Sequence, residues 1–104
     1  MKELNDNNFD KEIANSKLAL VDFYATWCGP CGLQAEVLKN LKSSRSLKFD
    51  IIKVNVDEAP ELALKYGVES IPTLMVFKGN ELLKRMVGVT GEQEILDVME
   101  EFED

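Results

Sequence analysis

Two short, nearly continuous apolar runs constrain the fold of this chain more than any other feature of its sequence. Residues 18–25 read Leu-Ala-Leu-Val-Asp-Phe-Tyr-Ala, and residues 49–56 read Phe-Asp-Ile-Ile-Lys-Val-Asn-Val. Such runs, rich in residues that favour strands, are typical of strands covered on both faces of a parallel sheet. Between them, over residues 32–48, apolar side chains recur at helical spacing, at Leu33, Val37, Leu38 and Leu41. The sequence therefore predicts a strand–helix–strand unit with parallel strands.

The flanking segments extend this unit in both directions. A helix is expected over residues 60–66, because Pro60 stands where a first-turn proline belongs and Gly67 where a C-terminal glycine belongs. Residues 73–77 and 81–87 read as two strands of a hairpin. The other expected elements are a brief strand at residues 2–5, a short helix around Phe9 and Ile13, and a final amphipathic helix that begins near Thr90 and Gly91 and includes Ile95, Met99 and Phe102.

This order of elements predicts an α/β fold with one mixed central sheet of about five strands and helices on both faces. The two crossovers give parallel strands, and the hairpin adds antiparallel strands at one side. A length of 104 residues fits a single domain over residues 1–104. With 45% hydrophobic and 30% charged residues, the chain has the composition of a globular protein.

The composition also narrows where the protein works. No apolar run approaches the roughly 20 residues of a membrane-spanning helix. The polar N-terminus lacks the apolar segment of a secretion signal. We therefore expect a soluble protein of the cytoplasm.

The net charge of −7 is concentrated at the C-terminus, where residues 92–104 hold seven acids and no Lys or Arg. Such a segment repels nucleic acids and anionic lipids, which argues against either as a partner. The simplest interpretation is a solvated helix face, and a docking surface for a basic partner is the alternative.

The chain has only two cysteines, in Trp27-Cys28-Gly29-Pro30-Cys31, where the first long strand ends and a helix begins. Residues three apart in a helical turn lie about 5–6 Å from each other, within the range that a disulfide needs. A helix N-terminus stabilises a thiolate, and ligand sites of open α/β sheets lie at the carboxyl ends of strands. We expect Cys28, nearer the open end, to be the attacking nucleophile and Cys31 the resolving thiol.

Other uses of the cysteine pair fit the sequence less well. A zinc site needs four ligands, and this chain has two cysteines and no histidine, which leaves only a site shared between chains. A purely structural disulfide across so short a loop would remove little chain entropy and would be unusual in the cytoplasm.

Over essentially its whole length, the sequence resembles the thioredoxin family. The resemblance rests on the Trp-Cys-Gly-Pro-Cys pentapeptide, on residues 21–25 before it, and on Ile71-Pro72-Thr73 and Val87-Gly88-Val89 after it. It implies a thioredoxin fold and an enzyme that reduces disulfides in partner proteins by thiol–disulfide exchange. Thiol–disulfide exchange needs no metal or organic cofactor in the chain itself, and nothing in the sequence demands more than a monomer. The sequence has no dinucleotide-binding fingerprint, so an external reductase must restore the dithiol, and the resemblance implies a flavin-dependent thioredoxin reductase.

Asp22 and Lys53 are charged residues inside the apolar runs. An unpaired carboxylate at Asp22 would be costly in a buried strand, so the residue is either an acid with a raised pKa or an edge residue that faces water. The resemblance implies that Asp22 exchanges a proton with Cys31 through water, and that Lys53 lies near Asp22 and lowers its pKa. A lysine that extends its ammonium to the surface is the alternative for Lys53.

The resemblance also implies a substrate groove beside Cys28. A cis bond before Pro72 would turn the Ile71 backbone toward a bound peptide, which could then pair as an added strand. The expected substrate-binding residues are Trp27, Gly29, Pro30, Ile71, Pro72, Thr73, Val87, Gly88 and Val89. The alternative is that these residues are scattered over the surface, as single exposed apolar groups usually are.

The chain departs from the common family pattern at Gly32, Glu36 and Tyr24, where relatives frequently have a basic residue, a kinking proline and a tryptophan. None of these changes removes a reacting group. The absence of histidine removes one means of stabilising the thiolate strongly, so we expect a reductant. A non-catalytic binding module and a different thiol enzyme, either an oxidant or a glutathione-dependent relative, remain as alternatives.

Overall fold

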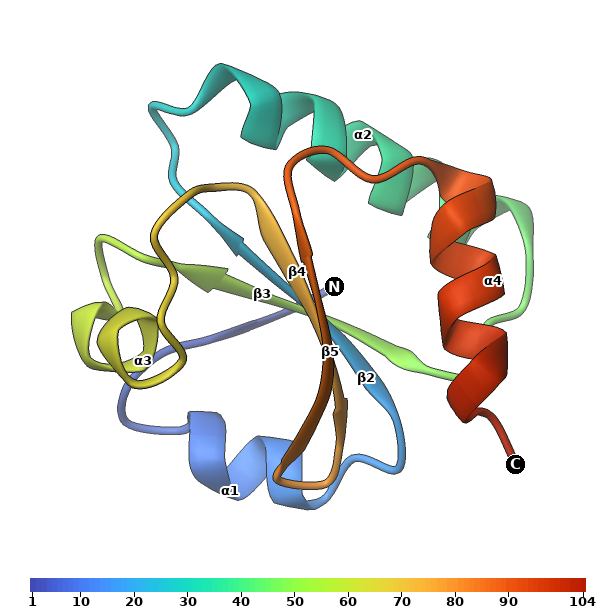
Figure 1. Cartoon of the computed structure of the whole chain (residues 1–104), viewed down its shortest axis with the longest axis horizontal. Helices are drawn as coiled ribbons and strands as arrows, with labels where there is room; N and C mark the ends of the chain where they lie inside the picture. The colour runs from blue at the N-terminus through green and yellow to red at the C-terminus, as the bar shows by residue number, and fades with distance from the viewer.

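A computed structural model describes residues 1–104 as a five-stranded sheet with four helices (Figure 1). The elements are β1 (Lys2–Leu4), α1 (Phe9–Ala14), β2 (Ala19–Tyr24), α2 (Gly29–Ser44), β3 (Asp50–Asn55), α3 (Pro60–Lys65), β4 (Thr73–Lys78), β5 (Glu81–Val87) and α4 (Glu92–Phe102). The strand order is β1-β3-β2-β4-β5, in which β1, β3 and β2 are parallel and β4 and β5 pair antiparallel. The predicted mixed sheet is confirmed.

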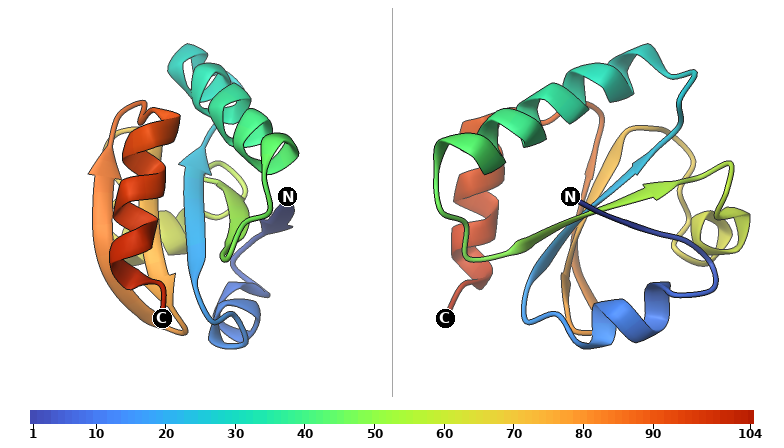
Figure 2. Two further views of the ribbon diagram at one scale, coloured as in Figure 1. Left: turned by 90° about the vertical axis from the view of Figure 1, so that its right-hand side faces the viewer. Right: turned by 180° about the vertical axis from the view of Figure 1, so that it is seen from behind.

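The two apolar runs form the middle of the sheet, where β2 pairs with β3 on one side and β4 on the other. Alternate residues of β2 enter different cores, because side chains of a strand point to opposite faces. Val21 and Phe23 pack under α1 and α3, whereas Leu20 packs under α2 and α4. Figures 1 and 2 show these helix pairs on opposite faces of the twisted sheet. The carboxyl end of β2 leads directly into α2.

Helix α2 begins earlier and ends earlier than the predicted range of residues 32–48. It starts at Gly29 because Cys28 caps it and Pro30 fits its first turn, and it ends where Arg45 takes an extended conformation. Its buried face consists of Cys31, Gln34, Leu38 and Leu41. The prediction that Leu33 faces the core is wrong, since this side chain is 64% exposed.

The hairpin and the last helix complete the fold. The hairpin turns at Gly79, whose φ of +58° is accessible to glycine without strain. Helix α4 buries Ile95, Val98 and Met99, and its acidic side chains lie toward solvent. None of the helices is both long enough and apolar enough to cross a membrane.

Asp6 caps a helix that lies far from it in the sequence. Residue Ala59 at the start of α3 offers no side-chain cap, and the Asp6 carboxylate accepts the N–H groups of Glu61 and Leu62 at 3.2 and 2.9 Å. These are two of the donors that a helix leaves unpaired in its first turn. The loop before α1 thereby fixes α3 against the sheet.

We expect Asp6→Ala to lower the free energy of unfolding by about 1 kcal/mol, the usual cost of losing a capping side chain. Urea denaturation measures this difference. The matched control is Asp10→Ala, because Asp10 forms only an exposed ion pair with Lys65. Equal stabilities of the two variants would contradict the capping role.

Candidate redox-active site

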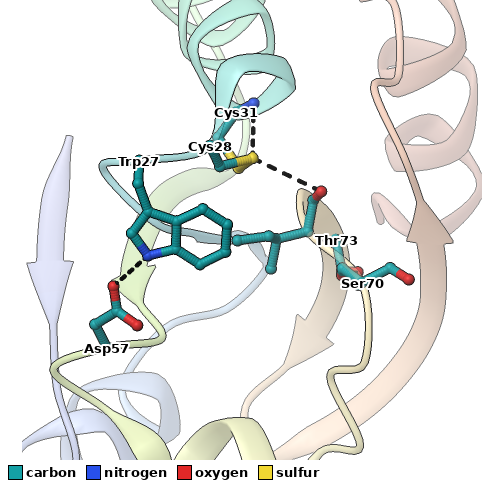
Figure 3. The surroundings of a disulfide bond; sticks show 7 residues. Trp27, Cys28, Cys31, Asp57, Ser70 and Thr73 are labelled. Atoms are coloured by element: carbon teal, nitrogen blue, oxygen red, sulfur yellow. Dashed lines mark hydrogen bonds between the residues drawn. A yellow bond between two sulfur atoms is a disulfide. The ribbon is translucent and has the colours of Figure 1, made fainter.

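Cys28 and Cys31 form a disulfide at the N-terminus of α2, with their Cα atoms 5.3 Å apart. Cys28 is the residue that caps the helix, and its Sγ accepts the N–H of Cys31 at 3.2 Å (Figure 3). A sulfur in this position receives both a backbone hydrogen bond and the positive end of the helix dipole. Both effects stabilise negative charge on the Cys28 sulfur when the disulfide is open.

The two sulfurs differ in their access to solvent. Cys28 is half-buried, whereas Cys31 is only 3% exposed. A partner protein can therefore reach Cys28 and is screened from Cys31 by the first turn of the helix. This asymmetry is what an attacking thiol in front of a resolving thiol requires.

The Ile71–Pro72 turn faces the disulfide from the other side. Its peptide bond is cis, as the sequence predicted, and Pro72 is buried. The carbonyl oxygen of Ile71 lies 3.8 Å from Cys28 Sγ. The Gly88 N–H donates to the Pro72 carbonyl at 2.9 Å, which joins the segment after β5 to the same turn.

Exposed apolar side chains next to Cys28 and at or just after the end of β5 form what we call the apolar collar. We give that name to the side chains of Trp27, Pro30, Val87 and Val89, all of which are exposed. Trp27 is 71% exposed and Val87 is 65% exposed. Gly29 is exposed between Trp27 and Pro30, whereas Ile71 and Gly88 are half-buried. Val87 pairs with Thr73 in the register of β4 and β5, next to the Ile71–Pro72 turn.

Two contacts shape the collar from behind. The indole N–H of Trp27 donates to Asp57 Oδ2 at 2.7 Å, which fixes the ring across the end of β3 (Figure 3). Thr73 is 2% exposed and its hydroxyl donates to the carbonyl of Ser70. The Thr73 side chain therefore holds the turn before β4 through this hydrogen bond.

Asp22 lies in the middle of β2 with no exposed surface, so the interpretation as an edge residue facing water is wrong. Neither carboxylate oxygen has a hydrogen-bond partner. Burial raises the pKa of Asp22 to about 6, because the charged form loses its hydration. The charge of Lys53 opposes this rise, and that of Glu3 adds to it.

Lys53 stands opposite Asp22 in the register of β2 and β3, yet the two side chains form no direct ion pair. Its ammonium lies 4.2 Å from the centre of the Tyr24 ring, a cation–π contact. The Tyr24 hydroxyl donates to Glu3 at 2.8 Å, and burial together with this contact raises the pKa of Tyr24. Lys53 is thus held near the buried acid by a ring and acts on it through space.

Three residues at or near the site were not singled out by the sequence patterns: Glu3, Gln34 and Asp57. Glu3 and Asp57 look like ordinary surface acids, since nothing local shows that they meet Tyr24 and Trp27. Gln34 did leave a signal, because it is a polar residue on the helix face that carries Leu38 and Leu41.

Comparison with known proteins agrees with this geometry. The thioredoxin family model matches residues 1–101 of the chain. Thioredoxin of Staphylococcus haemolyticus is 45% identical over 98 residues, which cover 94% of this chain and 93% of that protein. Thioredoxin 2 of Chlorobaculum tepidum is 44% identical over 100 residues, which cover 95% and 92%. A solved structure of a mutant thioredoxin from Halobacterium salinarum superposes with a TM-score of 0.89 at 30% identity, covering 99% of this chain and 90% of that chain.

A half-buried sulfur that caps a helix, with a second sulfur bonded behind it, defines a dithiol–disulfide oxidoreductase. Its redox-active pair is Cys28 and Cys31, and its substrates contain disulfides. The chain belongs to the thioredoxin family.

The raised pKa of Asp22 makes stability depend on pH in a definite direction. Because the folded-state pKa lies above the unfolded value of 3.8, the folded protein holds this proton more tightly. The stabilisation by the neutral acid is complete below pH 3.8 and is lost as the pH rises through about 6. Near neutral pH, ionised Asp22 therefore destabilises the fold.

We expect Asp22→Asn, compared with the wild type in the oxidised form, to gain about 3 kcal/mol in relative stability between acidic and neutral pH, from a pKa moved from 3.8 to about 6. Urea denaturation at several pH values measures the gain. A stability difference that does not vary with pH would contradict a buried, titrating Asp22.

Proposed function

We propose that this protein acts as a reductant of protein disulfides, with Cys28 as nucleophile and Cys31 as resolving thiol. One observation carries the proposal: the Cys31 N–H donates a hydrogen bond to the sulfur of Cys28, which is half-buried, whereas Cys31 itself is buried. In this proposal, residues 1–104 work as one domain.

The reaction consists of two thiol–disulfide exchanges. The Cys28 thiolate attacks one sulfur of the substrate disulfide, so a Cys28–substrate bond forms and the other substrate sulfur leaves as a thiolate that takes up a proton. Cys31 then loses its proton and attacks Cys28. The Cys28–Cys31 bond forms, the mixed disulfide breaks and the second substrate sulfur leaves. Two electrons have passed from this chain to the substrate.

Asp22 is proposed to accept the proton of Cys31 through a water molecule in the second exchange. Two observations support this role: the carboxylate oxygens have no partner in the protein, and the pKa of about 6 lies near neutrality, where a base can both take and release a proton. Lys53 is proposed to keep the pKa of Asp22 from rising further.

The apolar collar and the Ile71–Pro72 turn are proposed to bind the substrate. An extended peptide could pair with the backbone of Ile71 as an added strand, while its side chains lie on Trp27 and Val87. Such a complex would bring a substrate disulfide to Cys28, beside the Ile71 carbonyl that lies 3.8 Å from its sulfur.

Repeated turnover needs a donor that restores the dithiol. We propose a flavin-dependent thioredoxin reductase as that donor, so that the protein serves as an electron carrier between the reductase and its substrates. A reducing compartment suits such a cycle, and we propose the cytoplasm as its location.

The central test is insulin-disulfide reduction. The wild type is expected to reduce insulin with dithiothreitol as donor. Cys28→Ser should fall to the uncatalysed background, because the remaining thiol, Cys31, is only 3% exposed and cannot reach a protein disulfide. Cys31→Ser, reduced and freed of dithiothreitol before insulin is added, should instead accumulate a mixed disulfide, seen by mass spectrometry as the protein plus insulin. Insulin reduction by a Cys28→Ser, Cys31→Ser double variant at the wild-type rate would sink the proposal and favour a binding module.

A second test separates the two exchanges. We expect Asp22→Ala to slow release of the mixed disulfide by about tenfold to a hundredfold near neutral pH, the low end for positioned proton transfer, and to leave the first attack nearly unchanged. Stopped-flow fluorescence of Trp27 with a single-turnover substrate measures both steps. Equal slowing of both steps would rule out the proton-transfer role.

The same assay tests Lys53. Lys53→Met should raise the pKa of Asp22 and move the pH midpoint of the resolving step upward, because the opposing charge is gone. The matched control is Lys11→Met, which removes the same charge from an exposed position of α1 on the other face of the sheet. An unchanged midpoint in Lys53→Met would exclude the influence of Lys53.

A further inference from the structure

Gln34 joins two segments of the site that no backbone hydrogen bond joins directly. It is fully buried on α2, one turn after Cys31. Its amide nitrogen donates to the carbonyl of Thr90 at 3.0 Å, and its amide oxygen accepts the Thr90 N–H at 2.7 Å. One side chain thus satisfies both backbone groups of a residue that lies 56 positions away and outside any helix or strand.

Further hydrogen bonds connect Thr90 to the substrate side of the site. The Thr90 hydroxyl donates to the Gly88 carbonyl at 3.3 Å, and the Gly88 N–H donates to the Pro72 carbonyl at 2.9 Å. Pro72 follows Ile71, whose carbonyl faces the Cys28 sulfur. The start of α2, the segment after β5 and the cis-proline turn therefore form a ring of contacts around the disulfide, which Gln34 closes.

The chemistry of the contact is selective for an amide. Thr90 is 4% exposed, so its N–H and carbonyl would be left without partners if position 34 were apolar. A polar side chain on the buried face of a helix is otherwise unfavourable compared with a leucine. Gln has one donor group and one acceptor at the right separation to serve both backbone groups, and no other side chain of its length does so without charge.

We infer that Gln34 is a positioning residue that sets the wall of the substrate groove. It holds Val87, Gly88 and Val89 at a fixed place relative to the helix that carries the cysteines. The inference rests on the proposed function, since Gln34 is inferred to affect how protein disulfides bind in the groove and not the thiol chemistry. Without Gln34, Thr90 would lose both of its hydrogen bonds to α2, and the segment around it could shift relative to that helix. Val87 and Gly88 would keep their pairing with Thr73 and Pro72, and the sulfurs and their helix cap would stay in place.

The wild type alone offers a first test, by hydrogen exchange measured with NMR. The amide of Thr90 should exchange at least about a hundredfold more slowly than an unprotected amide, although it has no backbone acceptor. Fast exchange at Thr90 would overturn the inference before any variant is made.

The decisive variant is Gln34→Met, which keeps the length of the side chain and removes the donor and the acceptor. We expect exchange at Thr90 to accelerate by about tenfold, and KM for insulin to rise by about threefold to tenfold. The kcat with insulin, and the rate with cystamine, a small disulfide that does not fill the groove, should stay within about twofold of the wild type. Gln34→Leu serves as a second variant if the methionine variant does not fold.

The matched control is Gln93→Met, which removes the same amide from an exposed contact with Asp97 on α4. It should leave both exchange at Thr90 and KM for insulin unchanged. If Gln34→Met slows cystamine and insulin equally, Gln34 has only a general role in the fold and the inference is wrong. If the variant alters neither KM nor the exchange at Thr90, the contact holds nothing in place and the inference is likewise wrong. If the wild type itself fails to reduce insulin, the proposed function is wrong, and the exchange at Thr90 still reports on the Gln34 contact.

Discussion

The hydrogen bond from the Cys31 N–H to the sulfur of Cys28 is the interaction on which the rest of this structure depends. It makes one atom serve both as the cap of a 16-residue helix and as the reacting atom of the site. The position of α2 over the sheet, set by Leu38 and Leu41 in the core, therefore also fixes where the sulfur lies. Packing far from the disulfide is in this way converted into a defined electrostatic environment for a thiolate.

The sheet beneath the helix contains a buried acid, whose charged form is disfavoured, whereas the helix favours the charged form of the thiol. Asp22 occupies a core position where a valine or leucine would pack with less desolvation, and the protein tolerates the acid because it remains largely neutral until the pH nears 6. Lys53 is close enough to moderate this effect but is held on the ring of Tyr24 and forms no salt bridge with the acid. A direct ion pair would bind the carboxylate firmly and remove its ability to take up a proton near neutral pH.

Local patterns in the sequence were sufficient for the fold and for the reacting pair. The two apolar runs identified the central strands, and the spacing of Cys28 and Cys31 at a strand–helix junction identified the chemistry. Local patterns could not predict the burial of a residue whose surroundings come from a distant segment. Leu33 has the spacing of a core residue but its side chain is exposed on α2, and Gln34 is polar yet buried because Thr90, 56 residues away, supplies its partners. The cap that Asp6 provides for α3 and the hydrogen bond between Trp27 and Asp57 are likewise contacts between distant segments.

The first strand has a bearing on how this protein is handled at the bench. β1 is three residues long, lies at the edge of the sheet, and carries in its middle the Glu3 carboxylate that bonds Tyr24. Only Met1 and Lys2 would separate an affinity tag or cleavage scar joined ahead of Met1 from Glu3. Fraying of so short a strand would free the tyrosine ring under Lys53 and change the field at the buried acid. A titration curve recorded on a protein tagged at this end would report partly on the tag, and a fusion at the opposite terminus, beyond α4, avoids the problem.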